Sequence, residues 1–351
     1  MSLIVWVLAC GGGDEGSTTD AVDTDPGVTE TPGGGTLPDG VVCAPENVDE
    51  WIWGTPIREP LASMAFAGIA GQVYVLGGRT ETAVSDFALR GEFVEGALDW
   101  SPTTSLPSPV EEPASVVVEG RLYVIGGDDG TENWDTIWSA VSDELGELSV
   151  WREETPLPVP TRSASVISAV GRLYVAGGYA GGGLGDLTDA VWSTPVGADG
   201  VVGPWREESA LTEPSSGVAL GLGAAGLVAV GGLLGTAITN LAFEAEVGAD
   251  GVLGKWKEAG LYSDSVASVG LQFGDDLILL GGIAANGQSS NRGSSADLSG
   301  GWPLALLAIQ PLPAPRSAHA FMFAGDSLVV AGGLNQVGVP FNDVRVGLFC
   351  K

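Results

Sequence analysis

The sequence VYVLGG at residues 73–78 has five further copies along the chain, and each copy is a short apolar run that ends in two glycines. The copies are LYVIGG (122–127), LYVAGG (173–178), LVAVGG (227–232), LILLGG (277–282) and LVVAGG (328–333). Successive glycine pairs lie 49, 51, 54, 50 and 51 residues apart. A nearly constant period over most of the chain predicts one repeating architecture rather than separate unrelated domains.

Each repeat also carries a tryptophan and is predicted to form four short strands. The tryptophans are Trp51, Trp100, Trp151, Trp205, Trp256 and Trp302. In the second repeat we expect strands at residues 114–119, 121–126, 136–142 and 149–155. The second of these strands is apolar at nearly every position, which is typical of a strand buried on both faces. Four-stranded sheets bury both faces when they pack around an axis, so the pattern predicts an all-β, six-bladed β-propeller.

The repeats resemble those of the kelch family, in which an apolar strand ends in a double glycine and a tryptophan follows downstream. The family's aromatic residue, three positions before the glycines, is matched by Tyr74, Tyr123 and Tyr174. Val228, Ile278 and Val329 replace it in the last three repeats. The resemblance extends from residue 49 onward and implies four-stranded kelch-type blades.

The sixth repeat is incomplete at the C-terminus. Its third strand, expected at residues 342–348, has no tryptophan-bearing strand after it. A matching segment lies at residues 50–54, at the other end of the repeats. We therefore expect the N-terminal strand to complete the last blade and close the ring.

Two cysteines flank the repeats at this junction. When both ends of the chain are aligned with the second repeat, Cys43 and Cys350 fall at the level of the same residue, Asp143. We therefore expect a Cys43–Cys350 disulfide that joins the first strand to the last. Such a bond forms in an oxidising compartment, which fits an exported protein.

The N-terminus is predicted to direct export. Residues 1–10 contain the apolar run LIVWVLA followed by Cys10, and VLAC resembles the bacterial lipobox, whose cysteine carries the lipid. The run is too short to span a bilayer as a helix, and no Lys or Arg precedes it. Residues 11–42 are rich in Gly, Thr, Asp and Pro and are expected to form a disordered acidic linker to the propeller, residues 43–351. The expected location is the bacterial cell envelope, with a lipid anchor in the outer membrane.

Composition excludes several function classes. The net charge of −30 repels phosphate backbones, which argues against nucleic-acid binding, and we expect membrane contact only through the lipid on Cys10. One histidine and three cysteines are too few for a typical zinc or copper site, so no metal is expected. The chain has no nucleotide-binding or nucleophile motif in its required context, and we expect no cofactor.

Any ligand is expected at the end of the propeller that carries the loops after the glycine pairs. The candidate residues on this face are Arg79, Glu111, Asp128, Asp129, Trp134, Arg162, Tyr179, Arg316 and His319. The segments that lead into the first strands are predicted to place Ala62, Glu111, Arg162, Ser216, Val266 and Arg316 at equivalent positions. The arginines either bind a ligand or bond to neighbouring blades and Glu111, and His319 either has a structural role or takes part in catalysis.

Two functions remain open at the level of sequence. The first is a non-catalytic scaffold that binds a protein or a glycan, favoured because we find no catalytic constellation. The second is a carbohydrate-active enzyme similar to the sugar-acid mutarotases, which also use kelch blades. That activity needs a carboxylate and an arginine that converge, and Glu111 with Arg162 is the one candidate pair.

Mass spectrometry of the protein made in a Gram-negative host tests the predictions for the cysteines. Cys10 is expected to carry lipid, and Cys10→Ser is expected to release the protein from the membrane fraction. A digest without reduction is expected to contain Cys43 cross-linked to Cys350. An unmodified Cys10 would contradict the anchor, and alkylatable thiols at positions 43 and 350 would contradict the disulfide.

Overall fold

The computed structural model describes residues 48–94, 97–183, 185–261, 266–267, 270–300, 306–324 and 327–349. Within these ranges the regular secondary structure consists of strands, as predicted, and no helix there is long and apolar enough to cross a membrane. Cys10, Cys43 and Cys350, with the signal segment 1–10 and the linker 11–42, lie outside the described residues.

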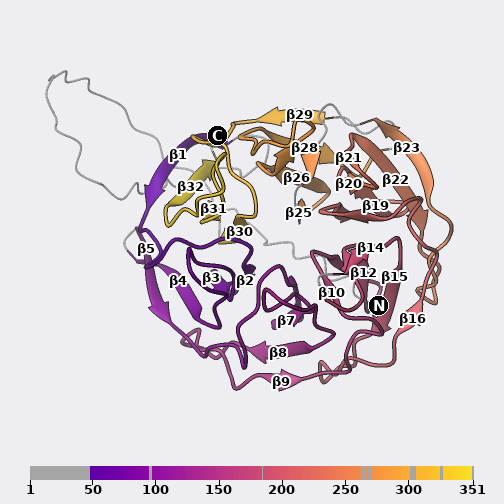
Figure 1. Ribbon diagram of the computed structural model, residues 1–351, viewed down its shortest axis with the longest axis horizontal. Coiled ribbons are helices and arrows are strands. Elements are labelled where there is room, and N and C mark those ends of the chain that lie inside the picture. The colour runs from indigo at the N-terminus through magenta and orange to yellow at the C-terminus, as the bar shows by residue number, and fades with distance from the viewer. Residues whose placement is uncertain are drawn as a thin grey trace, which may run out of the picture.

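Six antiparallel sheets of four strands each, among the described residues, lie around a central axis (Figure 1). Sheet 1 contains β2 (Ala65–Ile69), β3 (Gln72–Leu76), β4 (Ala88–Val94) and β5 (Ala97–Pro102). Sheet 2 contains β6 (Ala114–Val118), β7 (Arg121–Ile125), β8 (Ile137–Val141) and β9 (Arg152–Glu153). Sheet 3 contains β11 (Ser165–Ala169), β12 (Arg172–Ala176), β15 (Val191–Pro195) and β16 (Arg206–Glu207).

The second half of the chain continues the same order. Sheet 4 contains β18 (Ala219–Leu222), β19 (Gly226–Val230), β22 (Leu241–Glu246) and β23 (Lys257–Leu261). Sheet 5 contains β25 (Gly270–Phe273), β26 (Asp276–Leu280), β28 (Gly293–Asp297) and β29 (Leu306–Ile309). Sheet 6 contains β30 (Ala320–Ala324), β31 (Ser327–Ala331), β32 (Val344–Phe349) and β1 (Val48–Gly54). In each sheet the strand that comes first in this order lies innermost (Figure 1).

Short strands add a second layer of pairing at one end of the ring. They are β10 (Thr161–Arg162), β13 (Tyr179–Ala180), β14 (Asp186–Leu187), β17 (Ser215–Ser216), β20 (Leu233–Leu234), β21 (Ala237–Ile238), β24 (Val266–Ala267) and β27 (Ile283–Ala284). They pair the loop after a glycine pair with the segment that leads into the first strand of the same sheet.

The predicted strands of the second repeat agree with the structure except for the fourth. The strand expected at residues 149–155 pairs with its neighbour only at β9. Its backbone still bonds to β8 at two further points, because the amides of Ser149 and Glu154 donate to Val141 and Ile137. Its side chains reach sheet 3: Arg152 Nη2 donates to the Gly200 oxygen at 2.6 Å, and Glu154 accepts from the Val202 amide at 3.1 Å.

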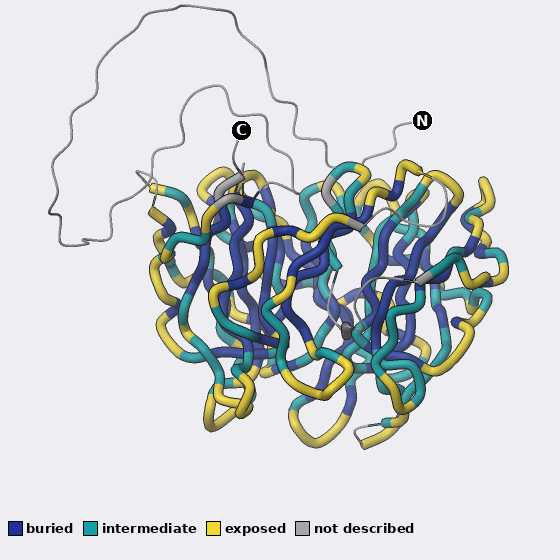
Figure 2. Tube along the Cα trace, turned by 90° about the horizontal axis from the view of Figure 1, so that it is seen from above, coloured by how far each residue is buried: buried dark blue, intermediate teal, exposed yellow. Residues whose placement is uncertain are grey.

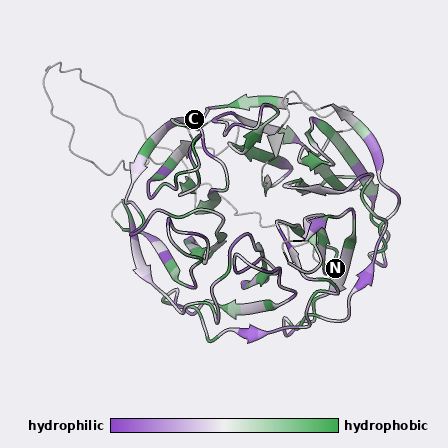
Figure 3. Ribbon diagram, viewed as in Figure 1, coloured by the Kyte–Doolittle hydropathy of each residue, from purple (hydrophilic) through white to green (hydrophobic). Residues whose placement is uncertain are grey.

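The core lies between the sheets. The second strands are buried along most of their length, as their continuous apolar runs predict, and Figure 2 shows the buried chain running through the middle of the molecule. Hydropathy follows the same division, with apolar strands toward the axis and polar outer strands such as β9 and β16 (Figure 3). The three repeat tyrosines link neighbouring sheets, because Tyr74, Tyr123 and Tyr174 donate to the turn carbonyls of Gly146, Gly200 and Gly251 at 2.7–2.9 Å.

Sheet 6 joins the two ends of the described chain. β1 pairs antiparallel with β32, and Trp51 lies opposite Gly347. The strand expected at residues 50–54 is therefore part of β1. The indole of Trp51 donates to Gln310 of sheet 5, and the indole of Trp100 in sheet 1 donates to Thr55, just after β1. The repeat tryptophans of sheets 2, 3 and 4 make the same contact with the preceding sheet.

The glycine pairs bring each sheet close to the next. Gly126 has a φ of +61°, and a Cβ atom there would lie 2.2 Å from the Thr161 carbonyl oxygen of the segment that leads into sheet 3. The following glycine, Gly127, donates its amide to the same oxygen at 3.0 Å. Any larger residue at Gly126 would separate the two backbones.

Replacing Gly126 with alanine is expected to lower thermal stability strongly. Gly120 is a matched control, because it also has a positive φ (+76°) but its Cβ would meet nothing within 4 Å. Gly120→Ala should lower the free energy of unfolding only by the backbone strain, about 1–2 kcal/mol. Gly126→Ala should lower it further, because its Cβ also clashes with the segment that leads into sheet 3. Equal melting temperatures for the two variants would contradict this account of sheet packing.

Candidate binding face

The loops that follow the glycine pairs lie against the lead-in segments, the short stretches that precede the first strand of each sheet. We call this end of the ring the loop face. Its loops begin at Arg79, Asp128, Tyr179, Leu233, Ile283 and Leu334. These residues pair with Ala62, Glu111, Arg162, Ser216, Ala267 and Ser317 of the lead-in segments. Each such pair brings two backbone positions of one sheet together at the loop face.

Arg79 and Glu111 form a bidentate ion pair between sheets 1 and 2. Arg79 Nε donates to Glu111 Oε2 at 2.6 Å, and Nη2 donates to the other carboxylate oxygen. The Glu111 side chain is 8% exposed and that of Arg79 is 46% exposed. The hydrogen bond to Glu111 raises the pKa of Arg79. Arg79 is thus held by a buried partner while part of its side chain remains accessible.

Arg162 is surrounded by two carboxylates and a ring. Its Nη1 donates to Glu112 Oε2, and its Nε lies 4.0 Å from Asp128 Oδ2. The guanidinium carbon lies 4.4 Å from the ring centroid of Tyr179, a cation–π contact. Ser163 also donates to Glu112. Sequence reasoning missed Glu112, although it is adjacent to the predicted Glu111.

Asp128 is a buried carboxylate beneath these arginines. Its Oδ1 accepts from the Gly130 amide at 2.7 Å. Burial raises the pKa of Asp128 to about 6, with repulsion from Glu111 and Glu112 in the same direction, while Gly130 and Arg162 act against it. We call Arg79, Glu111, Glu112, Asp128 and Arg162 the charged cluster. Its member Asp128 has a pKa of about 6.

Two other predicted residues have local structural roles. Asp129 Oδ1 accepts from the Thr131 hydroxyl and amide and from the Glu132 amide, which orders the loop. The Thr131 hydroxyl is the main cause that lowers the pKa of Asp129. Trp134 is half-buried and packs edge-on against Trp138 with ring centroids 5.7 Å apart. Both residues shape the loop of sheet 2.

Arg316 does not belong to the exposed face, contrary to expectation. Its side chain is 0% exposed, donates to Asp343 and to the Gly332 oxygen at 3.0 Å each, and lies over the Phe341 ring. The physical reason is register. The position equivalent to Glu111, which pairs with Asp128, is occupied in sheet 6 by Ser317, which pairs with Leu334, and not by Arg316. In sheet 5 the same position is occupied by Ala267 and not by the expected Val266. One residue of offset turns the arginine inward, between the sheets.

His319 is also buried, at 6% exposure, and is therefore not presented on the loop face. Its ring packs beside Phe321, and it lies against the glycine pairs of sheets 5 and 6, where a Cβ on Gly281 would meet it at 2.7 Å. Burial, with a smaller contribution from the charge of Arg316, lowers the pKa of His319 to about 3. A neutral histidine packed in this way has a structural role.

The structure thus brings Arg79, Glu111, Asp128, Arg162 and Tyr179 together on sheets 1 to 3. The sequence left open whether these arginines bind a ligand or bond to neighbouring sheets. The contacts in the structure are bonds to neighbouring sheets. Glu111 pairs with Arg79, and Arg162 pairs with Glu112, so the carboxylate and arginine required for the enzyme hypothesis each have another partner. Among the described residues, no group of three or more His, Cys, Asp or Glu side chains is arranged to hold a metal ion.

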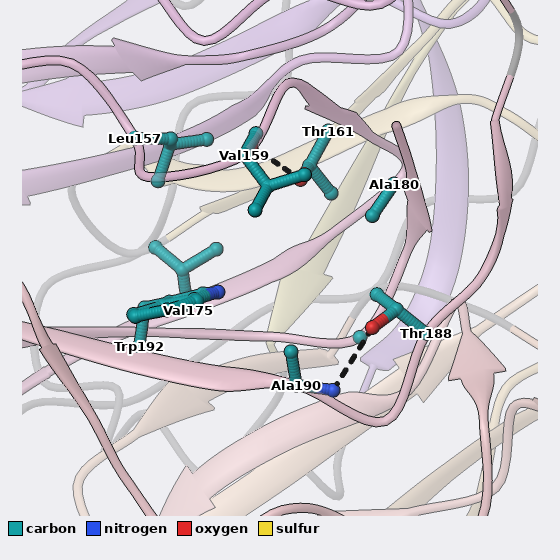
Figure 4. Close-up of a pocket in the computed structure, with 9 residues that line it drawn as sticks. Leu157, Val159, Thr161, Val175, Ala180, Thr188, Ala190 and Trp192 are labelled. Atoms are coloured by element: carbon teal, nitrogen blue, oxygen red, sulfur yellow. Dashed lines mark hydrogen bonds between the residues drawn. The ribbon is translucent and has the colours of Figure 1, made fainter. Parts of the chain in front are cut away.

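A small cavity lies beside this cluster, where the segment leading into sheet 3 meets sheet 3 itself. It has a volume of about 110 Å³. Leu157 and Val159 face Val175 and Trp192 across it (Figure 4). The volume equals that of a few water molecules, and the walls are mainly apolar. The cavity is therefore a small, mainly apolar packing gap between sheet 3 and the segment that leads into it.

Asp128→Asn is expected to change how stability depends on pH. The folded protein holds a proton on Asp128 up to about pH 6, whereas the unfolded chain releases it near 3.8. The protonation of Asp128 therefore contributes fully to the free energy of unfolding below pH 4. This contribution, up to about 3 kcal/mol, is lost as pH rises toward 6. Denaturant unfolding at pH 4 to 7 should show this loss in the natural protein and not in the variant.

The neighbouring Asp129→Asn is the control for this experiment. Because the pKa of Asp129 is lowered in the folded protein, its contribution is lost as pH falls, which is the opposite sign. If the stability difference between the natural protein and Asp128→Asn stays constant over this pH range, Asp128 is not the buried acid described above.

No protein-family model matches the chain. Kelch repeat and BTB domain-containing protein 1 of vaccinia virus is 26% identical over 139 residues, which are 38% of this chain and 24% of the viral protein. Mouse Kelch-like protein 35 is 29% identical over 36% of this chain and 21% of its own length, and human Kelch-like protein 33 is 30% identical over 33% and 22%. The match therefore spans about a quarter of the length of these relatives.

A solved structure, described as the structure of YjhT, shares the fold. It superposes with a TM-score of 0.64 at 16% identity, over 84% of this chain and 96% of that one. The glycine-pair repeats and the sequence similarity identify kelch-type repeats, and the four-stranded sheets around an axis give the chain a β-propeller fold.

Proposed function

We propose that this protein is a non-catalytic binding scaffold of the bacterial cell envelope that contacts a protein partner through the loop face. Its place among kelch-repeat proteins supports a role in protein interaction. The observation that carries the proposal is the contrast between the two ends of the ring. The loop face gathers Arg79, Arg162 and Tyr179 on neighbouring sheets, and Arg79 keeps about half of its side chain exposed.

The opposite end is explained by turn geometry. The GADG turns at residues 197–200 and 248–251 have the same construction: Asp199 accepts from the Val201 amide, Asp250 accepts from the Val252 amide, and both final glycines have a positive φ. Repetition of one turn gives no reason to assign a partner there. The loops of the loop face differ from sheet to sheet, and a partner is the simplest reason for that variety.

We further propose that the six sheets are the blades of one ring and that β1 closes it. The contact of Trp51 with sheet 5 supports this arrangement, as does the Gly333 amide, which donates to the Leu61 oxygen of sheet 1 at 2.8 Å. In this proposal a disulfide between Cys43 and Cys350 joins the ends. The pairing of Val48 with Phe349 supports it, because Cys350 directly follows Phe349 in the sequence.

The anchoring part of the proposal rests on sequence. A lipid on Cys10 and the acidic linker at residues 11–42 would hold the propeller at the outer membrane. A tethered head with an exposed loop face suits the capture of a partner in the envelope. Nucleic acid is not a partner in this proposal, since the net charge is −30.

Site-specific photo-cross-linking in living cells tests the binding face. A photoreactive phenylalanine analogue at Tyr179 is expected to form adducts with a partner protein. The same analogue at Val201, which is 41% exposed in a GADG turn, is the matched control and should form few. Arg79→Ala should reduce the adducts at position 179 several-fold at temperatures where the variant stays folded, although its melting temperature should fall because buried Glu111 loses its partner.

Two outcomes would contradict the proposal. Equal adducts at positions 179 and 201 would place the partner elsewhere. Faster anomer exchange of a sugar acid, measured by NMR and abolished by Glu111→Gln, would favour the enzyme alternative.

A further inference from the structure

A second and larger cavity lies on the loop face, on the other side of the ring from the charged cluster. Its volume is about 490 Å³, within the range of about 300–1,000 Å³ that is usual for small-molecule sites. It lies between sheets 5 and 6. Its walls come from the loop after the glycine pair of sheet 5, from Pro315 in the segment leading into sheet 6, and from Gln336 in the loop of sheet 6.

The polar walls of this cavity are mostly uncharged. The side chains that matter for ligand chemistry are Asn286, Gln288, Ser289, Asn291, Arg292 and Gln336. Among the described residues that line it, none is a carboxylate and none is aromatic, although the chain has 44 Asp and Glu residues. Amides and hydroxyls each donate and accept hydrogen bonds, and so do the hydroxyl groups of a sugar.

Several of these side chains make hydrogen bonds within the protein. Asn286 Oδ1 accepts from the Gln288 amide at 3.0 Å, and its Nδ2 lies 3.3 Å from Gln288 Oε1. Asn291 Nδ2 donates to the Leu312 oxygen at 3.2 Å. The hydroxyl of Ser289 lies 3.0 Å from that of Ser317, which connects the sheet 5 loop to sheet 6. Groups that are already ordered lose less entropy on binding.

Charge selects among polar ligands. The net charge of −30 disfavours anions at long range, and among the described residues of the cavity lining Arg292 is the one charged side chain, next to neutral amides and hydroxyls. The guanidinium of Arg292 can donate to hydroxyl oxygens as well as to carboxylates. We propose that the cavity between sheets 5 and 6 binds a neutral, polyhydroxylated ligand, a short uncharged saccharide. This role is separate from the protein contact proposed for sheets 1 to 3.

Saturation-transfer difference NMR on the full chain tests this site. The probes are glucose, galactose, mannose and N-acetylglucosamine, with galacturonate and an aspartate-containing tetrapeptide for comparison. Because no aromatic ring is available for stacking, affinity for the best neutral sugar should be weak, on the order of 1 mM. The double variant Asn286→Ala with Gln288→Ala should weaken binding about tenfold or more, since each lost hydrogen bond is worth about fivefold.

Two controls make the result specific. Gln310→Ala removes an exposed amide that is outside the cavity lining, just after the outer strand of sheet 5, and should leave sugar binding unchanged. Gln336→Ala changes the opposite wall and should also weaken binding. Both the double variant and Gln336→Ala should melt at the temperature of the natural protein, because these side chains are exposed.

The proposal is overturned if no neutral sugar shows saturation transfer at a sugar concentration of about 20 mM, which is 20-fold above the expected Kd. It is also overturned if the double variant binds as the natural protein does, or if galacturonate or the peptide binds more tightly than every neutral sugar. The cross-linking at position 179 should be unaffected by the double variant, so failure of the sugar site and failure of the protein-binding face are distinguished.

Discussion

A backbone hydrogen bond between neighbouring sheets determines the geometry of the rest of the molecule. The second glycine of a pair donates its amide to a carbonyl of the next lead-in segment, as Gly78 does to Val110 and Gly178 to Ser215, both at 2.7 Å. The bond requires two backbones to approach closely, and a Cβ on the first glycine of the pair would clash with the same carbonyl, at 2.5 Å for Gly77 and Val110, which is why that position is glycine. Among the described residues this bond is present at five glycine pairs, those of sheets 1, 2, 3, 5 and 6, so the same contact recurs from sheet to sheet.

This contact also decides which side chains meet on the loop face. Once loop and lead-in segment are paired, residues many positions apart in the sequence lie within hydrogen-bond distance. Arg79 and Glu111 are separated by 32 residues, and Arg162 and Glu112 by 50. Removing charges from water is costly, and such charges persist in a fold when partners of opposite sign are close. The charged cluster therefore stabilises contacts between sheets and at the same time leaves Arg79 accessible.

The loop face has two chemically different regions. Sheets 1 to 3 carry ion pairs and the Arg162–Tyr179 stack, and the cavity beside them is small and apolar. Sheets 5 and 6 carry amides and hydroxyls around a larger cavity, with the buried Arg316–Asp343 pair in sheet 6. A surface with partly exposed charged and aromatic side chains suits contact with a protein, whereas a cavity with neutral hydrogen-bonding groups suits a small polar molecule. One ring can thus offer two kinds of recognition at the same end.

The sequence by itself determined the all-β class, the period, the buried second strands and the strand at residues 50–54 that lies in β1. These features follow from local requirements, because each repeat needs an apolar run for its buried strand and glycines where the backbone has a positive φ. Tertiary structure alone decided that Arg316 faces inward while Ser317 pairs with Leu334. It also decided that Glu112 pairs with Arg162, that the pKa of Asp128 is about 6, and that amides of the sheet 5 loop surround a cavity. Those outcomes depend on distances between residues that only the packing of sheets brings together, and a shift of one residue in a lead-in segment reverses the side that a side chain faces.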